Sequence, residues 1–234
     1  MNEALKKVVI LQSNYIPWKG YFDLIHDADL FIFFDDVQYT VRDWRNRNKV
    51  KTVDGTKWLT VPVVATHTSL INEVKIFENK WSKKHWETIK HLYSKAPFFK
   101  QYKSWFEHLY LEKSYETLSE CNRHMIKAIS QEILHIDTEF QNSRSYNVSG
   151  QKTDRLIEIL KKTSANIYVS GPAAKTYIEA DKFKENNIEL IYKDYSGYPE
   201  YPQLYGEFNH YVTILDLIFN MGTNAPYYIW GWRT

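Results

Sequence analysis

Two short apolar runs, each stopped by polar residues, constrain the fold of this chain more than any other feature. Leu30–Phe34 is continuously apolar and ends abruptly at Asp35 and Asp36. Such a run is typical of a parallel strand that is buried on both faces and delivers its next side chains to the carboxyl edge of a sheet. The run Lys7–Leu11 ends in the same way at Gln12. We therefore expect a β-α-β unit whose ligand lies beyond the carboxyl ends of the strands.

The remaining hydrophobic pattern predicts one α/β domain over residues 1-234, with a mostly parallel, Rossmann-like sheet. Trp58–Val64 is expected to be a third strand, and the apolar spacing from Ser82 to Leu134 becomes helical, which predicts a helical insertion at 82-135. The alternation then returns with strands near Thr138–Asn142, Asn166–Val169 and Ile188–Tyr192, and with helices at Lys152–Lys162, around Ala173–Ala180 and at Val212–Asn220.

Composition excludes several classes of function. Lys and Arg number 30 against 28 Asp and Glu, so the net charge of +2 gives no general attraction to nucleic acid or to an anionic membrane. No apolar run approaches the roughly 18 residues of a spanning helix, and none resembles a signal peptide. We expect a cytoplasmic protein without membrane insertion. Cys121 is the only cysteine, which excludes an intrachain disulfide, and no His pair has the spacing of a metal site.

Aromatic residues make up 16% of the chain, and many stand in loops beside Gly, Asn, Gln or Arg. Amphipathic rings in loops suit a pocket for a ring-bearing ligand such as a sugar or a base. The loop after the first strand concentrates them together with two amides. We expect its side chains to converge on a ligand, against the alternative of a plain connector, and the candidates are Gln12, Asn14, Tyr15, Trp18 and Tyr21.

Two further segments offer polar chemistry. Asp35 and Asp36 point to opposite faces of an extended chain, so one can serve as a base while the other caps or pairs; Asp36 would share a face with Gln38. The segment after them holds three cations, two amides and an indole in six residues, which suits recognition of phosphate or carboxylate, although a solvated turn gives the same pattern. Its candidates are Trp44, Asn46, Arg47, Asn48 and Lys49.

Five motifs occur in order along most of the chain: Gln12-x-Asn-Tyr-x-Pro-Trp-x-Gly-Tyr-Phe22, Asp35-Asp-Val-Gln-Tyr39, Trp44-x-Asn-Arg-Asn48, Trp58-Leu-Thr-Val-Pro62 and Tyr168-x-Ser-Gly-Pro-Ala-Ala174. Together they resemble the WbqC-like protein family. The resemblance implies an enzyme of bacterial surface-polysaccharide gene clusters, often associated with O-antigen sugars. The family's first loop usually reads His-Gln-Pro-Asn, whereas this chain has Leu11-Gln12-Ser13-Asn14, so we do not place catalysis there. His85 matches the family's pattern at a helix start and is our candidate for the catalytic histidine, against the alternative of a structural histidine.

A late turn suggests a second way to hold an anion. Ser170 and Gly171 follow a predicted strand, and Lys175 stands one turn into the next helix, so backbone N–H groups and a cation can cradle phosphate. The arrangement is similar to the phosphate loop of HIGH-type nucleotidyltransferases, and we expect a HIGH-nucleotidyltransferase-like sheet. Both histidines of their early motif are replaced here, in Trp18-Lys-Gly-Tyr21. An ordinary helix-opening turn is the alternative.

These observations lead to three functional hypotheses. The first is a transferase that moves an acyl or aminoacyl group onto an amino sugar or its nucleotide-linked form, with His85 or Asp36 as base and Arg47 and Lys175 on phosphate. It implies a sugar or nucleotide-sugar substrate and an acyl carrier protein or CoA as donor. The second is a nucleotidyltransferase-like enzyme using ATP with magnesium. The third is a non-catalytic protein that binds a ligand or a partner. The residues specify no metal site and no cofactor of their own.

Overall fold

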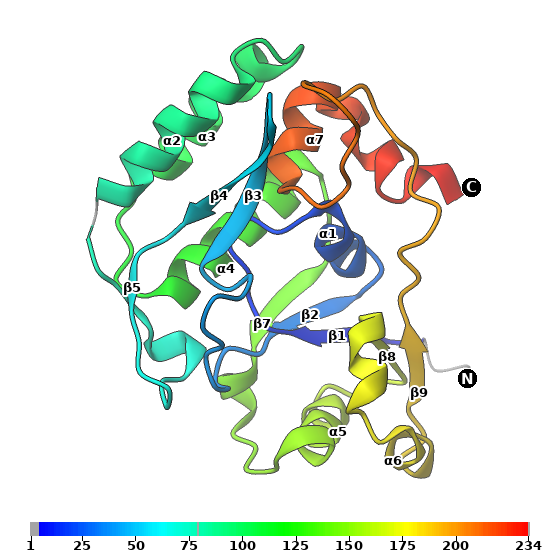
Figure 1. The fold of residues 1–234 in the computed structure, drawn as a ribbon. Helices are drawn as coiled ribbons and strands as arrows, with labels where there is room; N and C mark the ends of the chain where they lie inside the picture. Colours follow the sequence, from blue (N-terminus) through cyan, green and yellow to red (C-terminus); the bar gives the residue numbers. More distant parts are fainter. Residues whose placement is uncertain (1–4, 79, 234) are drawn as a thin grey trace.

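The computed structural model describes residues 5–78 and 80–233, and a five-stranded sheet forms the centre of the fold (Figure 1). All neighbouring strands of this sheet run parallel. The chain builds outward from β1 first to one side and then to the other, so the strand order reverses between β1 and β8. The expected Rossmann-like α/β fold is confirmed, and the reversal is the place at which open α/β sheets in general bind their ligands. In spatial order the strands are β7 (Glu139–Asn142), β2 (Leu30–Phe33), β1 (Lys7–Leu11), β8 (Ile167–Ser170) and β9 (Glu189–Tyr192).

Helices cover both faces of the sheet because its strands are apolar on both sides. Val9 of β1 packs into one core, whereas Val8 and Ile10 pack into the other. The first core carries α1 (Lys19–His26), α2 (Lys80–Tyr93), α3 (Phe99–Leu111), α4 (Leu118–Ala128) and α7 (Ile214–Met221), and the second carries α5 (Lys152–Lys162) and α6 (Ala180–Glu185).

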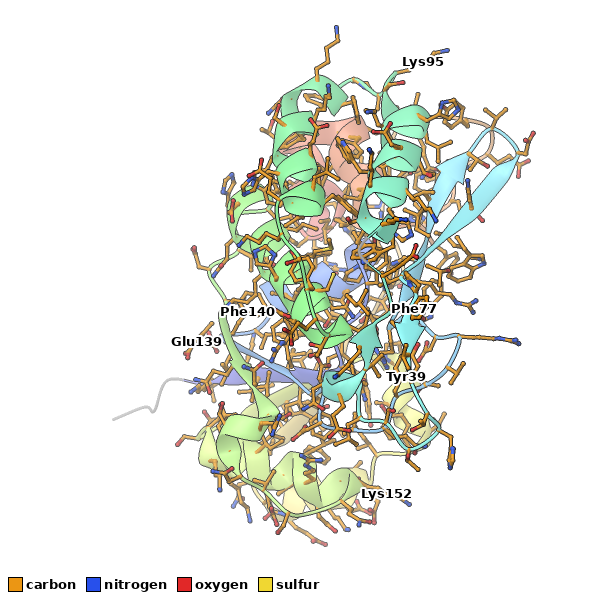
Figure 2. All side chains as sticks on the ribbon, turned by 90° about the vertical axis from the view of Figure 1, so that its left-hand side faces the viewer. Tyr39, Phe77, Lys95, Glu139, Phe140 and Lys152 are labelled. Atoms are coloured by element: carbon orange, nitrogen blue, oxygen red, sulfur yellow. The ribbon has the colours of Figure 1, made fainter. Side chains whose placement is uncertain are left out.

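The two sets of helices lie at opposite ends of the molecule. In Figure 2, Lys95, between α2 and α3, marks one end and Lys152 of α5 marks the other, with edge strand β7 between them at Glu139 and Phe140. Among the described residues, no helix combines the length and apolar character needed to cross a bilayer. Short helical turns complete the chain: η1 (Ile71–Glu73), the π-helical η2 (Ile129–Ile133), η3 (Ser143–Tyr146), η4 (Pro172–Thr176), η5 (Gly222–Tyr228) and η6 (Gly231–Arg233).

An antiparallel hairpin outside the main sheet corrects one prediction. We expected a single strand at Trp58–Val64, but β3 (Arg47–Thr52) pairs with β4 (Gly55–Thr60), with Lys49 opposite Trp58. A separate two-residue strand β5 (Val63–Val64) pairs with β6 (Lys75–Ile76). The sequence did not predict β3. Its buried face begins with an amide and its outer face carries cations, so the strand lacks the alternation of apolar and polar residues by which a strand is recognised.

The helix predicted around Ala173–Ala180 is also wrong. The chain instead forms the 3-10 turn η4, in which the Ala174 N–H donates to the Gly171 carbonyl (3.1 Å), and α6 begins at Ala180. Pro172 starts this turn favourably but has no N–H to contribute, and the tight i to i+3 pattern does not continue into an α-helix.

A buried ion cluster fastens the C-terminal segment to α1. Asp23 is fully buried and accepts hydrogen bonds from Lys193 (2.8 Å), from both terminal nitrogens of Arg233 (2.9 and 2.7 Å) and from the Tyr198 hydroxyl. Lys193 also pairs with Asp27. Two carboxylates therefore meet two cations, which satisfies the condition for burying charge.

Candidate functional site

A pocket of about 250 Å³ opens where three segments of the chain meet. The first segment is the loop after β1, the second is the entry to β3, and the third precedes α7. The first two are the segments that the sequence singled out. Its lining residues are Asn14, Pro17, Trp18, Trp44, Asn48 and Tyr211.

Hydrogen bonds fix the first loop against the hairpin entry. The Tyr15 N–H donates to the Trp44 carbonyl (3.0 Å). The Asn48 amide donates to the carbonyls of Tyr15 (3.1 Å) and Ile16 (2.7 Å), and Asn48 is buried. Asn48 thus uses both of its N–H groups to hold the loop, so its part in the pocket is that of a wall.

The third segment is joined to the other two through its backbone. The Thr213 N–H donates to the Lys49 carbonyl and the Ile214 N–H donates to the Pro17 carbonyl, both at 2.9 Å. These bonds place Tyr211, just before them, at the pocket's edge with 69% of its surface exposed. The sequence did not predict Tyr211, because its contact with the first loop is long-range and follows no local pattern.

The Trp18 indole covers the start of α1. A Cβ at Gly20 would overlap the Trp18 ring, so any larger residue there would displace the indole. The same ring lies 5.1 Å from the Tyr195 ring and 6.1 Å from the Tyr211 ring. The N-terminal end of α1 is therefore covered by an indole that also lines the pocket.

Arg45, which the sequence reading passed over, links the predicted amides. Its guanidinium donates from Nη1 to Asn14 Oδ1 and from Nη2 to Gln12 Oε1 (3.3 Å). The Asp43 carboxylate stands 3.7 Å from Nη2, beyond hydrogen-bond distance, and the Arg45 side chain is 14% exposed. Arg45 belongs to the charged run that drew attention to this segment, but local sequence did not indicate which of its cations turns inward.

The outer face of the hairpin presents an exposed indole between two cations. The Arg47 guanidinium lies 4.3 Å and the Lys49 ammonium 5.0 Å from the centre of the Trp58 ring. Trp44 lies 5.3 Å from Trp58 and joins this face to the pocket. Neither cation forms an ion pair within the described part of the chain. Arg47 also borders a second hollow of about 270 Å³, which Asn46 lines as well.

His85 lies behind the first loop and outside the pocket lining. Its Nδ1 is 2.7 Å from the Tyr15 hydroxyl, which in turn is 3.0 Å from the Tyr110 hydroxyl. Burial lowers the pKa of the imidazole to about 4, although a hydrogen bond with the Thr60 backbone acts in the opposite sense. His85 is therefore neutral near pH 7 and supports the loop through Tyr15; its assignment as a base remains a prediction.

The two adjacent aspartates have separate partners. Asp35 is buried and accepts hydrogen bonds from the Ser13 N–H (2.8 Å) and the Ser119 hydroxyl. The Asp36 carboxylate pairs with Arg155 of α5. The expected divergence of the two side chains is seen, and both stabilise the end of β2. A catalytic role for Asp36 remains a prediction, and Asp36 does not line the pocket.

Of the other predicted residues, Tyr21 and Asn46 support the segments that form the pocket, whereas Gln38 lies in a different loop. The Tyr21 hydroxyl donates to the Gln12 carbonyl (3.0 Å), which supports the first loop, and the Asn46 amide donates to the Val61 carbonyl (3.0 Å). Gln38 instead donates to the His67 carbonyl (2.6 Å) in an exposed loop.

The turn at Ser170 and Gly171 follows β8, on one side of the reversal of strand order between β1 and β8. Ser170 ends β8 and is buried, and Gly171 follows it directly. Lys175 is exposed, with its ammonium 5.2 Å from the centre of the Tyr192 ring. Because η4 is a five-residue 3-10 turn, it offers less aligned N–H density than the predicted α-helix. In the described residues, no cluster of three or more His, Cys, Asp or Glu side chains is arranged to hold a metal ion.

Comparison with known proteins extends over nearly the whole chain. A sequence model described as the WbqC-like protein family matches residues 12–228. An uncharacterized protein of Mycobacterium tuberculosis, Rv1507c, is 45% identical over 227 residues, which cover 96% of this chain and 98% of that protein. No solved structure matches.

Proposed function

The chain belongs to the WbqC-like protein family, and from this premise we propose that it is a transferase of bacterial surface-polysaccharide biosynthesis. Its acceptor would be an amino sugar or the nucleotide-linked form of one, and the group transferred would be acyl or aminoacyl. The supporting observation is the pocket that two indoles and a phenol enclose beside an amide, at Trp18, Trp44, Tyr211 and Asn14.

The shape and chemistry of this pocket suit a single sugar ring. Its volume of about 250 Å³ lies below the roughly 300 Å³ at which pockets for drug-sized molecules begin. Aromatic faces pack against the apolar C–H faces of a ring, while an amide recognises a hydroxyl or an N-acyl group. Trp44 is 42% exposed, so its ring can contact a ligand without rearrangement of the core.

The hairpin face next to the pocket suits the phosphate groups of an activated sugar. Arg47 and Lys49 flank Trp58 without a carboxylate partner among the described residues, so their charge is available to an anion. Trp44 touches both the pocket and this face. A nucleotide-linked sugar would place its ring in the pocket and its diphosphate over Arg47 and Lys49.

One observation favours nucleotidyl transfer as a second candidate. The strand order, with its reversal between β1 and β8, is the arrangement expected for a HIGH-nucleotidyltransferase-like sheet. The Trp18 ring over Gly20, however, fills the place where such an enzyme would receive phosphate. We therefore rank this function second, and a binding protein without catalysis third.

A thermal-shift and calorimetric screen of nucleotide-sugars, free sugars, CoA thioesters and ATP with magnesium tests the proposal. We expect nucleotide-linked amino sugars to raise the melting temperature, because a ligand bound only by the folded state stabilises it. Stabilisation by ATP with magnesium alone would favour nucleotidyl transfer instead. Turnover of an acyl donor with a bound amino sugar would then separate an enzyme from a binding protein.

Trp44→Ala gives the matched test of the pocket. Loss of one aromatic contact of about 1–1.5 kcal/mol should weaken sugar binding about tenfold. Trp105→Ala is the control: this partly buried indole of α3 is bonded to Glu132 (2.8 Å) and does not line the pocket, so its loss should leave the affinity unchanged. Equal effects of the two substitutions would exclude this pocket as the sugar site.

A further inference from the structure

Arg45 sets the direction in which two amides of the site point. A guanidinium has N–H donors and no acceptor, so the atoms of Gln12 and Asn14 that face it must be their oxygens. The hydrogen bonds have this arrangement, with Asn14 Oδ1 and Gln12 Oε1 both accepting from Arg45. The nitrogen of each amide is consequently turned away from the arginine.

Those amide nitrogens have no hydrogen-bond partner within residues 5–78 and 80–233. Asn14 lines the pocket, so its NH₂ group is the part of the amide that remains for a ligand. Asn48, the other amide in the lining, already spends its N–H groups on Tyr15 and Ile16. The polar side of the pocket near Asn14 therefore offers hydrogen-bond donors.

The charge at this place is positive and incompletely matched. Arg45 donates to neutral amide oxygens, its Nε is buried without a partner, and its ion pair with Asp43 is long, at 3.7 Å from Nη2. Donors beside a cation that no carboxylate reaches at hydrogen-bond distance favour an acceptor that carries negative charge.

We propose that the ligand of this pocket carries an oxyanion, a carboxylate or a phosphate, which the NH₂ group of Asn14 binds and the charge of Arg45 attracts, with Gln12 held on the same guanidinium beside the pocket lining. This inference rests on the proposed function and narrows its substrate to acidic or phosphorylated sugars. Arg45 is then a positioning residue: it sets the orientation of both amides and supplies the positive charge, while Asn14 makes the contact.

The test uses the full chain labelled with ¹⁵N and follows the side-chain amide signals of Asn14 and Gln12. Three sugars of similar size are titrated: glucuronate, with a carboxylate; glucose 1-phosphate, with a phosphate; and glucose, with neither. Inorganic phosphate is titrated as a fourth probe. We expect the two anionic sugars to shift both amide signals and to bind at least tenfold more tightly than glucose. The anionic sugar that binds more tightly identifies the oxyanion.

A variant that adds a negative charge at position 14 supplies the second readout. Asn14→Asp keeps an acceptor for Arg45 but removes the donor and adds a negative charge, so binding of the anionic sugars should fall at least tenfold. Gln101→Glu, at an exposed position of α3, makes the same kind of change elsewhere and should leave binding unaltered. The unfolding midpoint of each variant shows whether it is folded. If a variant does not fold, the titration of the unsubstituted protein still tests the inference.

The outcomes separate this inference from the proposed function. If glucose binds as tightly as the two anionic sugars, the oxyanion inference is wrong while the sugar pocket stands. If no sugar binds but inorganic phosphate shifts the Asn14 and Gln12 amide signals, the anion site stands and the sugar-transferase proposal fails. If neither sugars nor phosphate move these signals, both are overturned.

Discussion

Two arginines of this chain face oxygen atoms in opposite ways. Arg233 donates both terminal nitrogens to the carboxylate of Asp23, inside a cluster where Lys193 and Asp27 complete the pairing of charge. Arg45 donates its terminal nitrogens to two neutral amides, and its only ion pair among the described residues, with Asp43, is long, at 3.7 Å. The difference teaches that Arg233, whose charge is matched at hydrogen-bond distance, stabilises the fold, whereas Arg45 has the weaker pairing that we propose leaves it able to attract a ligand.

The largest effect should come from breaking the matched cluster. Asp23→Asn keeps the shape but leaves Arg233 and Lys193 with one carboxylate between them, and removing a partner from a buried pair costs about 3–5 kcal/mol. Urea unfolding followed by fluorescence measures the loss. A midpoint close to that of the unsubstituted protein would show that the cluster is not the C-terminal anchor described above.

The second-largest effect should be a pH dependence of stability that arises from His85, behind the first loop. The folded pKa of His85, lowered by burial to about 4, lies below its ordinary value of 6.5. The unfolded chain therefore binds more protons between those values, and the free energy of unfolding should fall as the pH drops from 6.5 to 4. The total contribution is roughly 3 kcal/mol, and it should be absent from His85→Gln. If the free energy of unfolding changed with pH equally in both proteins across this range, the prediction would be wrong.

Arg45→Met should separate stability from binding. Because each lost hydrogen bond has a neutral amide as acceptor, we expect a loss of about 1–2 kcal/mol in unfolding free energy, well below that of Asp23→Asn. Affinity for an anionic sugar should instead fall about tenfold or more. Without Arg45 the Asn14 NH₂ group is no longer held toward the ligand, and a hydrogen bond to a charged ligand contributes about 1.5–3 kcal/mol. Calorimetric titration and urea unfolding of one preparation measure both. A variant as unstable as Asp23→Asn would place Arg45 among the anchoring residues.

The smallest effect should appear at an exposed ion pair. Lys182 lies 2.7 Å from Asp154, but the side chains are 34% and 62% exposed, so solvent and salt screen the attraction. Asp154→Asn should leave the unfolding midpoint where it was. A shift comparable to that of Asp23→Asn would mean that burial does not decide which ion pairs stabilise this chain.

The sequence predicted the sheet better than the site, for a physical reason. Buried parallel strands require continuous apolar runs, so Leu30–Phe33 and Lys7–Leu11 were recognisable without any tertiary information. The direction of a polar side chain depends on where a strand begins. Three cations share the segment from Trp44 to Lys49, and only the position of β3 turns Arg45 toward the first loop and Arg47 outward.

The loop after β1 and the segment before β3 were both singled out in the sequence, and the structure brings them together. The third contributor, Tyr211, was not predicted, because nothing in its local sequence records that Thr213 and Ile214 bind the backbone at Lys49 and Pro17. Pairing across the chain is decided by the packing of α7 on the sheet and hairpin. Local periodicity carries no information about such packing.

Main-chain hydrogen bonds at Tyr15, Thr213 and Ile214 determine the outline of the pocket, and substitutions of side chains leave such bonds in place. The backbone that shapes the pocket is therefore independent of the side chains that line it. Under the proposed function, related proteins can exchange an indole for a smaller ring or an amide for a carboxylate, and so acquire a different substrate, while the cleft keeps its form. Divergence of specificity within the family should therefore concentrate at Asn14, Trp18, Trp44 and Tyr211.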